Sequence, residues 1–259
     1  MMARYARSAR IIVLVSLLLS GAGCSSHKSP ESPPTPKLPD LSGVWQIAQP
    51  LTALTSESGG APPLTPEGAK IYQQRVAASR AGDTSWDDTA KCKPPGEPRT
   101  LFEMGWPFQI GQSPERVVFM FQWNRYVRVI EMGLKLADFD GPFFYGRSSG
   151  AWEGDTLVAH VIGVREQVAL DSTGLPHSDD MKMVERFRLI NAGQQLEARI
   201  HFEDPVTFTQ PWDTVLVFNR LPETAIVEDH CLDRLHLPNS YRPTLEQRGG
   251  AEPTATRGS

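Results

Sequence analysis

Residues 145–164 read YGRSSGAWEGDTLVAHVIGV, and this stretch decides the fold that we expect for the chain. A glycine lies between two runs rich in β-forming residues, where it can supply the positive φ that a tight hairpin requires. Along the second run, Leu157 and Ala159 fall on one face of an extended strand, and Val158 and His160 fall on the other. Both faces are largely apolar, so the pattern predicts a strand covered on both sides, as in the centre of a barrel or sandwich.

The same period-two alternation continues along the rest of the chain. Runs at 116–123 and 124–132 come first, and runs at 181–190 and 194–203 then flank the hairpin signal Asn-Ala-Gly. A last run, WDTVLVFNR at 212–220, ends the series. About eight to ten short strands of this kind predict a mainly β protein, in which an antiparallel meander closes as a barrel.

One helix is expected before these strands, at about residues 66–81. Thr65 is a suitable N-cap, and Pro66 suits the first helical position. Gly82 can end the helix. The following residues, 83–115, contain several proline breaks and are interpreted as loops.

The N-terminus has the features of a secretory signal. Three arginines precede the apolar run at 11–19, which is too short to span a bilayer, and small residues follow it. Gly-Ala-Gly before Cys24 resembles the lipobox of bacterial lipoproteins, although Gly21 stands where that pattern usually has Leu. The resemblance implies a signal peptide over 1–23 and a lipid on Cys24, and Ser25 then favours the outer membrane. The alternative is a plain signal peptide that leaves Cys24 as a free thiol.

The domain organisation follows from composition. Residues 24–40 are rich in Pro and Ser and are typical of an extended tether. No second change of composition marks a boundary after that, so we expect a single β-barrel domain over 41–259, with a flexible C-terminal tail at about 243–259. The protein is therefore expected to be exported and anchored in the membrane through the lipid on Cys24.

Charge and cysteine content limit the possible partners. Removal of 1–23 takes away three arginines and no acid, so the formal net charge falls from −4 to −7. Nucleic acid requires clustered Lys and Arg, so we expect no nucleic-acid partner.

If Cys24 is lipidated, Cys92 and Cys231 remain and are expected to form a disulfide in an oxidising compartment; two separate buried thiols are the alternative. Neither cysteine has a CxxC neighbour, so no metal site is expected.

Gly43-Val44-Trp45, at the start of the first expected strand, resembles the first signature of lipocalins and related calycins. The resemblance implies that Trp45 closes one barrel end and that an arginine of the last strand packs across it. Arg220 stands at that position. Another antiparallel barrel or a sandwich remains the alternative. The wider pattern LSGVW, LTPEGA, GRSSGAWEGDTLV, LPHSDDMKMVERF and PW resembles a group of exported bacterial proteins of unknown function, which implies nothing about mechanism.

Possible acid–base chemistry centres on His177, Asp179 and Glu185. A histidine and a carboxylate together can transfer protons, because burial and mutual charge move their pKa values toward neutrality. The alternative for the loop residues is that they only form turn hydrogen bonds. Glu185 differs from them, because its neighbours at even spacing are apolar and direct it inward. A buried carboxylate requires a partner, which would be Arg128, Arg147 or a ligand.

Aromatic and basic residues form a second group of candidates. Such side chains around a barrel mouth suit an amphipathic or anionic small molecule. Ordinary core packing with solvated arginines is the alternative. The chain has no P-loop, dinucleotide fingerprint or GxSxG motif, so no cofactor is expected. The predicted ligand-binding residues are Trp123, Tyr126, Arg128, Tyr145 and Arg147.

These observations predict an outer-membrane lipoprotein whose lipocalin-like barrel binds a small apolar or amphipathic ligand in its cavity. The alternative is a cofactor-independent enzyme of the hydrolase, isomerase or lyase type, which would use His177 with Asp179 or Glu185 in the same cavity. A third possibility is a scaffolding protein of the cell envelope, which would expose a large apolar patch.

Overall fold

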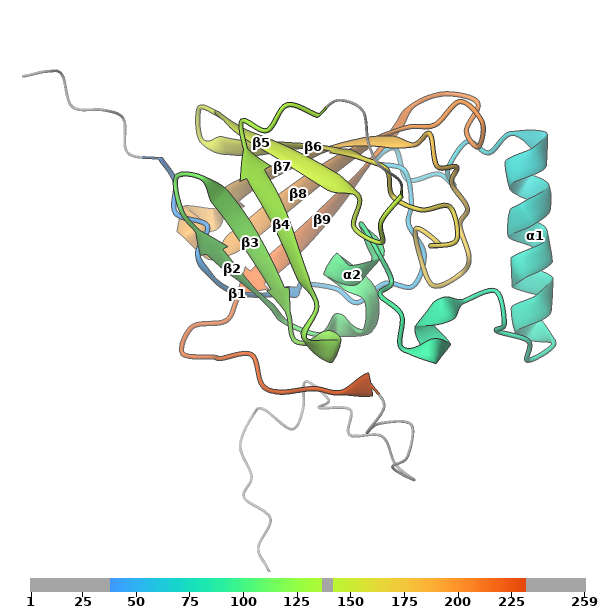
Figure 1. Ribbon diagram of the computed structural model, residues 1–259, viewed down its shortest axis with the longest axis horizontal. Coiled ribbons are helices and arrows are strands. Elements are labelled where there is room, and N and C mark those ends of the chain that lie inside the picture. Colours follow the sequence, from blue (N-terminus) through green and yellow to red (C-terminus); the bar gives the residue numbers. More distant parts are fainter. Residues whose placement is uncertain (1–37, 137–141, 232–259) are drawn as a thin grey trace, which may run out of the picture. The chain divides into compact units, whose positions relative to one another are not determined.

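Nine strands pair in chain order, and the first also pairs with the last, so that the sheet closes into a barrel (Figure 1). This computed structural model describes residues 38–136 and 142–231. The predicted signal peptide, Cys24 and the tail at 243–259 lie outside the described residues. The prediction of a mainly β protein with a closed barrel is confirmed. The strands are β1 Gly43–Ile47, β2 Phe108–Gln112, β3 Arg116–Phe121, β4 Val127–Met132, β5 Arg147–Glu153, β6 Thr156–Ile162, β7 Lys182–Ile190, β8 Gln195–Glu203 and β9 Trp212–Arg220.

One pair of strands departs from the expected antiparallel meander. β4 and β5 are parallel, with Ile130 opposite Ser148 and Met132 opposite Gly150, whereas the other paired strands are antiparallel. An odd number of strands cannot alternate in direction all the way around a closed ring, so a barrel of nine strands needs a parallel pair. β5 therefore begins at the end of the barrel at which β4 began.

The helices are few. α1 spans Pro66–Arg80, close to the predicted 66–81, and the Thr65 hydroxyl accepts a hydrogen bond from the backbone N–H of Gly68 at 3.1 Å. The region interpreted as loops contains more structure than expected, namely the strand β2, the short helix α2 at Arg99–Phe102 and two 3₁₀ turns. The 3₁₀ turns among the described residues are η1 Asp88–Lys91, η2 Glu103–Gly105, η3 Trp123–Arg125 and η4 Asn191–Gly193.

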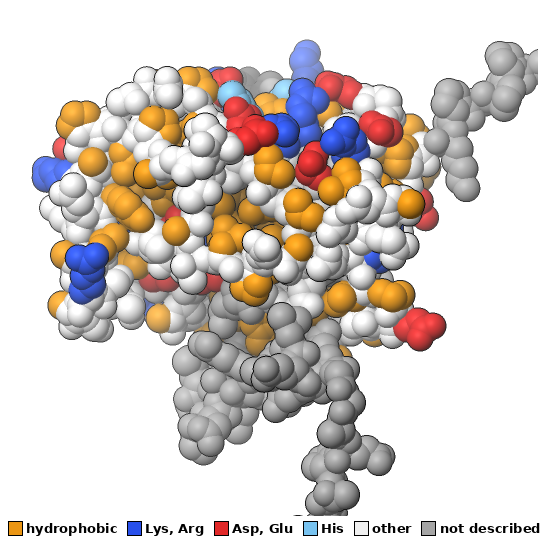
Figure 2. All heavy atoms as spheres, turned by 180° about the vertical axis from the view of Figure 1, so that it is seen from behind, with side chains coloured by type: hydrophobic (Ala, Val, Ile, Leu, Met, Phe, Trp, Pro, Cys, Tyr) orange, Lys and Arg blue, Asp and Glu red, His pale blue; other side chains and the backbone are white. Residues whose placement is uncertain are grey.

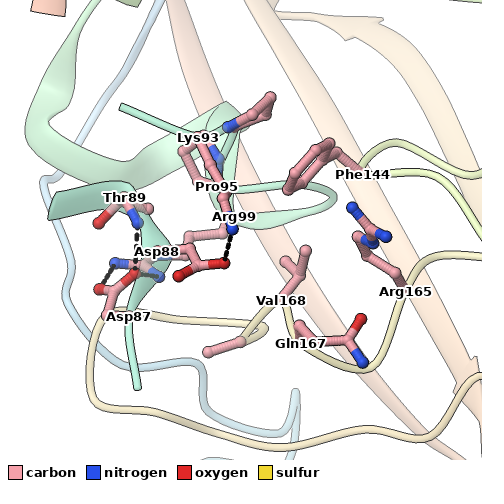
Figure 3. Close-up of a pocket in the computed structure, with 12 residues that line it drawn as sticks. Asp87, Asp88, Thr89, Lys93, Pro95, Arg99, Phe144, Arg165, Gln167 and Val168 are labelled. Carbon is pink, nitrogen blue, oxygen red and sulfur yellow. Dashed lines mark hydrogen bonds and ion pairs between the residues drawn. The ribbon is translucent and has the colours of Figure 1, made fainter. Parts of the chain in front are cut away.

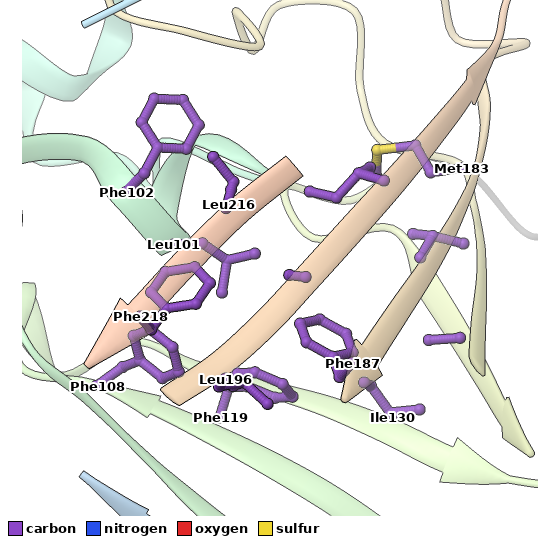
Figure 4. Packing of buried hydrophobic residues seen from close by; sticks show 14 of the residues in the cluster. Leu101, Phe102, Phe108, Phe119, Ile130, Met183, Phe187, Leu196, Leu216 and Phe218 are labelled. Atoms are coloured by element: carbon purple, nitrogen blue, oxygen red, sulfur yellow. The ribbon is translucent and has the colours of Figure 1, made fainter. Parts of the chain in front are cut away.

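α2 packs into the barrel core. Its residues Leu101 and Phe102 are buried in the same hydrophobic cluster as Leu216 and Phe218 of β9 (Figure 4). A four-residue helix has little stability of its own, so this burial holds it in place. The segment that leads into α2 is thereby brought to the barrel interior.

Aromatic side chains fill much of that interior. Phe108 lies 5.2 Å from Phe218 and 5.7 Å from Phe119, and Phe119 lies 5.2 Å from Phe187, measured between ring centroids. These rings are fully buried (Figure 4). Removal of one such ring typically costs about 3–5 kcal/mol. This level of the barrel is therefore a packed core, and space for a ligand must be sought elsewhere.

The contact expected between Trp45 and Arg220 is present. The two residues are register partners on β1 and β9, and the Arg220 guanidinium lies 4.2 Å from the centre of the indole. Arg220 also donates hydrogen bonds of 2.8 Å to the backbone oxygens of Ser42 and Gly193. Gly43 has φ +142°, and a Cβ there would lie 2.5 Å from Arg220 Nη1. The glycine of the motif therefore leaves room for the arginine.

Two further expectations meet different outcomes. The structure joins Cys92 to Cys231, with Cα atoms 5.6 Å apart, so the predicted disulfide fits the fold. The expectation that both faces of β6 are covered holds only in part. Val158 on the outer face is buried, but His160 on the same face is exposed to solvent.

Candidate functional site

The most unusual feature of the barrel is a buried arginine that contacts two buried carboxylates. The Arg128 side chain is 1% exposed, and those of Glu97 and Glu185 are 0% exposed. Arg128 Nη1 lies 3.1 Å from one oxygen of Glu185, and Nη2 forms a second, shorter contact with the other oxygen. Nη1 also lies 3.3 Å from Glu97 Oε1, and Nη2 donates to Ser148 Oγ at 3.1 Å. We refer to Glu97, Arg128 and Glu185 as the buried triad.

Strand alternation and the burial of α2 bring the triad together. Arg128 lies on the inward face of β4, and its guanidinium lies 5.7 Å from the centre of the Phe119 ring on β3. Glu185 faces inward on β7 between Met183 and Phe187, as the sequence predicted. Glu97 comes from the segment before α2. The structure therefore identifies Arg128 as the partner that Glu185 requires.

The charges of the triad do not balance if both carboxyl groups are ionised. Burial raises the pKa of Glu97, and the nearby Glu185 raises it further, so that despite the attraction of Arg128 the pKa is about 8. Burial acts to lower the pKa of Arg128, but the two carboxylates outweigh that effect, and the pKa is raised overall. At neutral pH the triad therefore holds one proton on Glu97 and has a net charge near zero.

A groove of about 540 Å³ lies where β4 and β5 separate, and Arg128 is the member of the triad that lines it. These strands pair only from Ile130 onward, so that β4 residues 127–129 pair with β3 on one side alone. Their other edge therefore faces the groove without a ladder partner among the described strands. The groove is lined by residues that include Val127, Arg128, Val129, Phe143, Tyr145 and Arg147.

One polar donor beside this groove, Nε of Arg128, is buried and has no hydrogen-bond partner within the part of the chain that the structure describes. The Tyr145 hydroxyl is also buried and has the side chain of Thr100 within hydrogen-bonding reach. Burial raises the pKa of Tyr145, so the phenol keeps its proton at neutral pH and can donate. The Tyr145 ring stacks on Phe121 with centroids 6.0 Å apart, which fixes its position. Buried polar groups are normally paired, so the unpaired Nε of Arg128 beside the groove indicates a place for a hydrogen-bond acceptor.

The five predicted ligand-binding residues divide into two groups. Arg128, Tyr145 and Arg147 line the groove, with Arg147 exposed at its rim. Trp123 and Tyr126 are not among its lining residues, although the Tyr126 ring packs 6.4 Å from Tyr145 and 5.5 Å from Trp123. They support the tyrosine from the η3 turn, and their role in binding stays a prediction.

The predicted acid–base residues do not meet. His177 is buried, its Nδ1 lies 2.9 Å from the Ser178 carbonyl oxygen, and burial lowers its pKa, so the ring is neutral. Asp179 is exposed and accepts a hydrogen bond of 2.6 Å from the backbone N–H of Glu166. Among the described residues, no hydrogen bond or ion pair joins His177 to Glu185. This geometry agrees better with the alternative, in which the loop residues form turn hydrogen bonds.

Sequence reasoning missed Glu97 and Ser148. Glu97 lies in the proline-rich PPGEP, where no periodicity indicates burial. Ser148 could have been found, because it alternates with Gly150 on the inward face of β5. Among the described residues, no group of His, Cys, Asp and Glu side chains could hold a metal ion.

Comparisons with known proteins assign no family to the chain. No protein-family model matches the chain, and no curated protein matches it. In the described part of the chain, no helix combines the length and apolar character needed to cross a membrane.

Proposed function

We propose that the protein binds a small apolar or amphipathic molecule in the groove between β4 and β5. The observation that carries this proposal is a groove where the sheet opens, lined by Tyr145 and by Arg128, whose Nε has no hydrogen-bond partner among the described residues. The groove volume of about 540 Å³ lies within the usual range for ligand pockets, which is roughly 300–1,000 Å³.

The lining favours a ligand with an apolar body and an acceptor at one end. Val127 is 52% exposed and Phe143 is 55% exposed, so both offer apolar surface at the groove. The triad is near neutral at pH 7, so its donors can bind a neutral acceptor such as a carbonyl or hydroxyl oxygen. Arg147 at the rim would also tolerate a negative charge.

Nucleic acid is not among the proposed ligands. The chain has a formal net charge of −4. On the face seen in Figure 2, Lys and Arg side chains lie beside Asp and Glu instead of forming a continuous basic surface. Binding to phosphates depends on such a surface.

Tyr145→Phe tests the proposed site. The change removes one donor and keeps the ring that stacks on Phe121. Loss of a hydrogen bond of about 1.4 kcal/mol weakens binding about tenfold. We expect mass spectrometry of molecules that co-purify with the wild-type protein to detect a ligand, and the Tyr145→Phe protein to retain roughly a tenth as much of it.

Tyr72→Phe is the matched control, because Tyr72 lies on α1 and its hydroxyl hydrogen-bonds to Thr173 outside the groove. This variant should retain the ligand at the wild-type level. Equal retention by Tyr145→Phe and wild type, or the absence of any bound molecule in all three proteins, would count against the groove.

We also propose that the barrel is anchored to the outer membrane through lipid on Cys24. The basic, apolar and small-residue regions of 1–23 support this proposal. Cys24→Ala is expected to leave the protein unprocessed or to release it from the membrane, which cell fractionation with a mass measurement will show. Ser26→Ala, two residues further on, should change neither. A Cys24→Ala protein that is still matured and membrane-bound would contradict the anchor.

A further inference from the structure

A second pocket lies beside the groove and is smaller. It is formed by η1, the segment before α2 and residues 165–169 (Figure 3). Phe144 and Pro94 line both sites, so they form the boundary between them. Its volume of about 180 Å³ equals that of about six water molecules, which limits any ligand to a small molecule.

Most charged groups of this pocket are already paired. Asp88 lies 2.5 Å from the Lys93 ammonium, and Asp87 lies 2.7 Å from an Nη atom of Arg99 (Figure 3). Arg99 also contacts Glu103. These pairs neutralise one another and leave little charge to attract a ligand.

Arg165 is the exception. Its side chain forms no hydrogen bond or ion pair with the described residues, and its Nε is buried. Its guanidinium lies 4.8 Å from the centre of the Phe144 ring, and its backbone N–H donates to the Phe143 carbonyl at 3.0 Å. Figure 3 shows Arg165 and Phe144 together, across the pocket from Arg99 and Asp87. A fixed and uncompensated cation therefore forms one wall.

We propose that this pocket binds a small carboxylate. An arginine that stacks on an aromatic ring uses the face of its guanidinium, which leaves the N–H groups at the edge free. That edge matches the two oxygens of a carboxylate in a bidentate contact. Phe144, Val168 and Pro95 are among the few apolar residues of a lining that is mostly polar or charged. This site is separate from the one in the proposed function and does not depend on it.

Benzoate is the probe for this site. We expect it to shift the side-chain Nε–H resonance of Arg165 in NMR spectra of the purified full-length protein, where that resonance is identified by its loss in Arg165→Gln. The dissociation constant for benzoate, measured by calorimetry, should rise at least tenfold in Arg165→Gln. It should also rise in Arg165→Lys, because lysine keeps the charge and loses the bidentate edge.

Arg186→Gln is the matched control and should leave benzoate affinity unchanged, because Arg186 pairs with Glu153 and lines neither the groove nor this pocket. Failure of this site would show as an Nε–H resonance that does not move at saturating benzoate, or as equal affinity in wild type and Arg165→Gln. Inorganic phosphate that binds more tightly than benzoate would overturn the assignment to a carboxylate. None of these results alters the outcome expected for Tyr145→Phe, so the two sites can fail separately.

Discussion

Arg128→Met is expected to lower the free energy of unfolding by about 3–5 kcal/mol at pH 7. Methionine fills a similar volume, but the change leaves Glu97 and Glu185 fully buried without the cation that both contact. Removal of one partner from a buried ion pair typically has a cost of this size, because the remaining charge must stay unpaired or take up a proton. Urea unfolding followed by fluorescence will measure the difference.

The pH dependence of this loss identifies its cause. Without Arg128, a buried charged carboxylate has no cation to compensate it, so the destabilisation grows as pH rises and shrinks as pH falls toward 4. Arg186→Met is the control, because Arg186 forms an exposed pair with Glu153 that contributes about 1 kcal/mol or less. A loss from Arg128→Met that is equal at pH 5 and pH 8 would indicate poor packing instead of unpaired charge.

The sequence predicted the barrel because alternation determines which side of a strand is buried. Phe187 and Glu185 follow the same inward period on β7, and both are fully buried. The parallel pairing of β4 and β5 was not predicted, since it depends on the total number of strands and on the closure of the ring. β2 was missed because prolines on both sides of it indicated a loop.

The candidate site also contains residues whose positions the sequence could predict and residues whose positions it could not. Arg128 and Glu185 lie on strands, so their inward orientation and their pairing could be expected from the sequence. Glu97 and Arg165 lie in segments without regular structure, where orientation depends on contacts that are distant in the sequence. Glu97 is held by the packing of Leu101 and Phe102 in the barrel core, and local sequence carries no signal of that packing.

Glu97→Gln is expected to stabilise the protein near neutral pH, although it removes one contact of Arg128. The pKa of Glu97 rises from 4.5 to about 8 on folding because the group is buried beside Glu185. The folded protein therefore takes up a proton that the unfolded chain lacks at pH 7. At about 1.4 kcal/mol for each pH unit above 4.5, this uptake costs about 3 kcal/mol at pH 7. Glutamine is neutral and has nearly the same shape, so it avoids this cost.

The sign of the effect gives a sharp test. An acid whose pKa is raised on folding does not lower the free energy of unfolding at pH values below its unfolded-state pKa of 4.5. Above that pH its cost grows, until the pH passes the folded-state pKa of about 8. We therefore expect wild type and Glu97→Gln to have similar unfolding free energies at pH 4. The variant should exceed wild type by about 1–3 kcal/mol at pH 7, because folding of the wild type then includes the cost of protonating Glu97 and folding of the variant does not. Glu153→Gln, which changes an exposed carboxylate, should follow the wild-type curve within about 0.5 kcal/mol. A Glu97→Gln protein that is less stable than wild type at pH 7 would show that Glu97 is ionised in the fold and serves Arg128 as a second counter-ion.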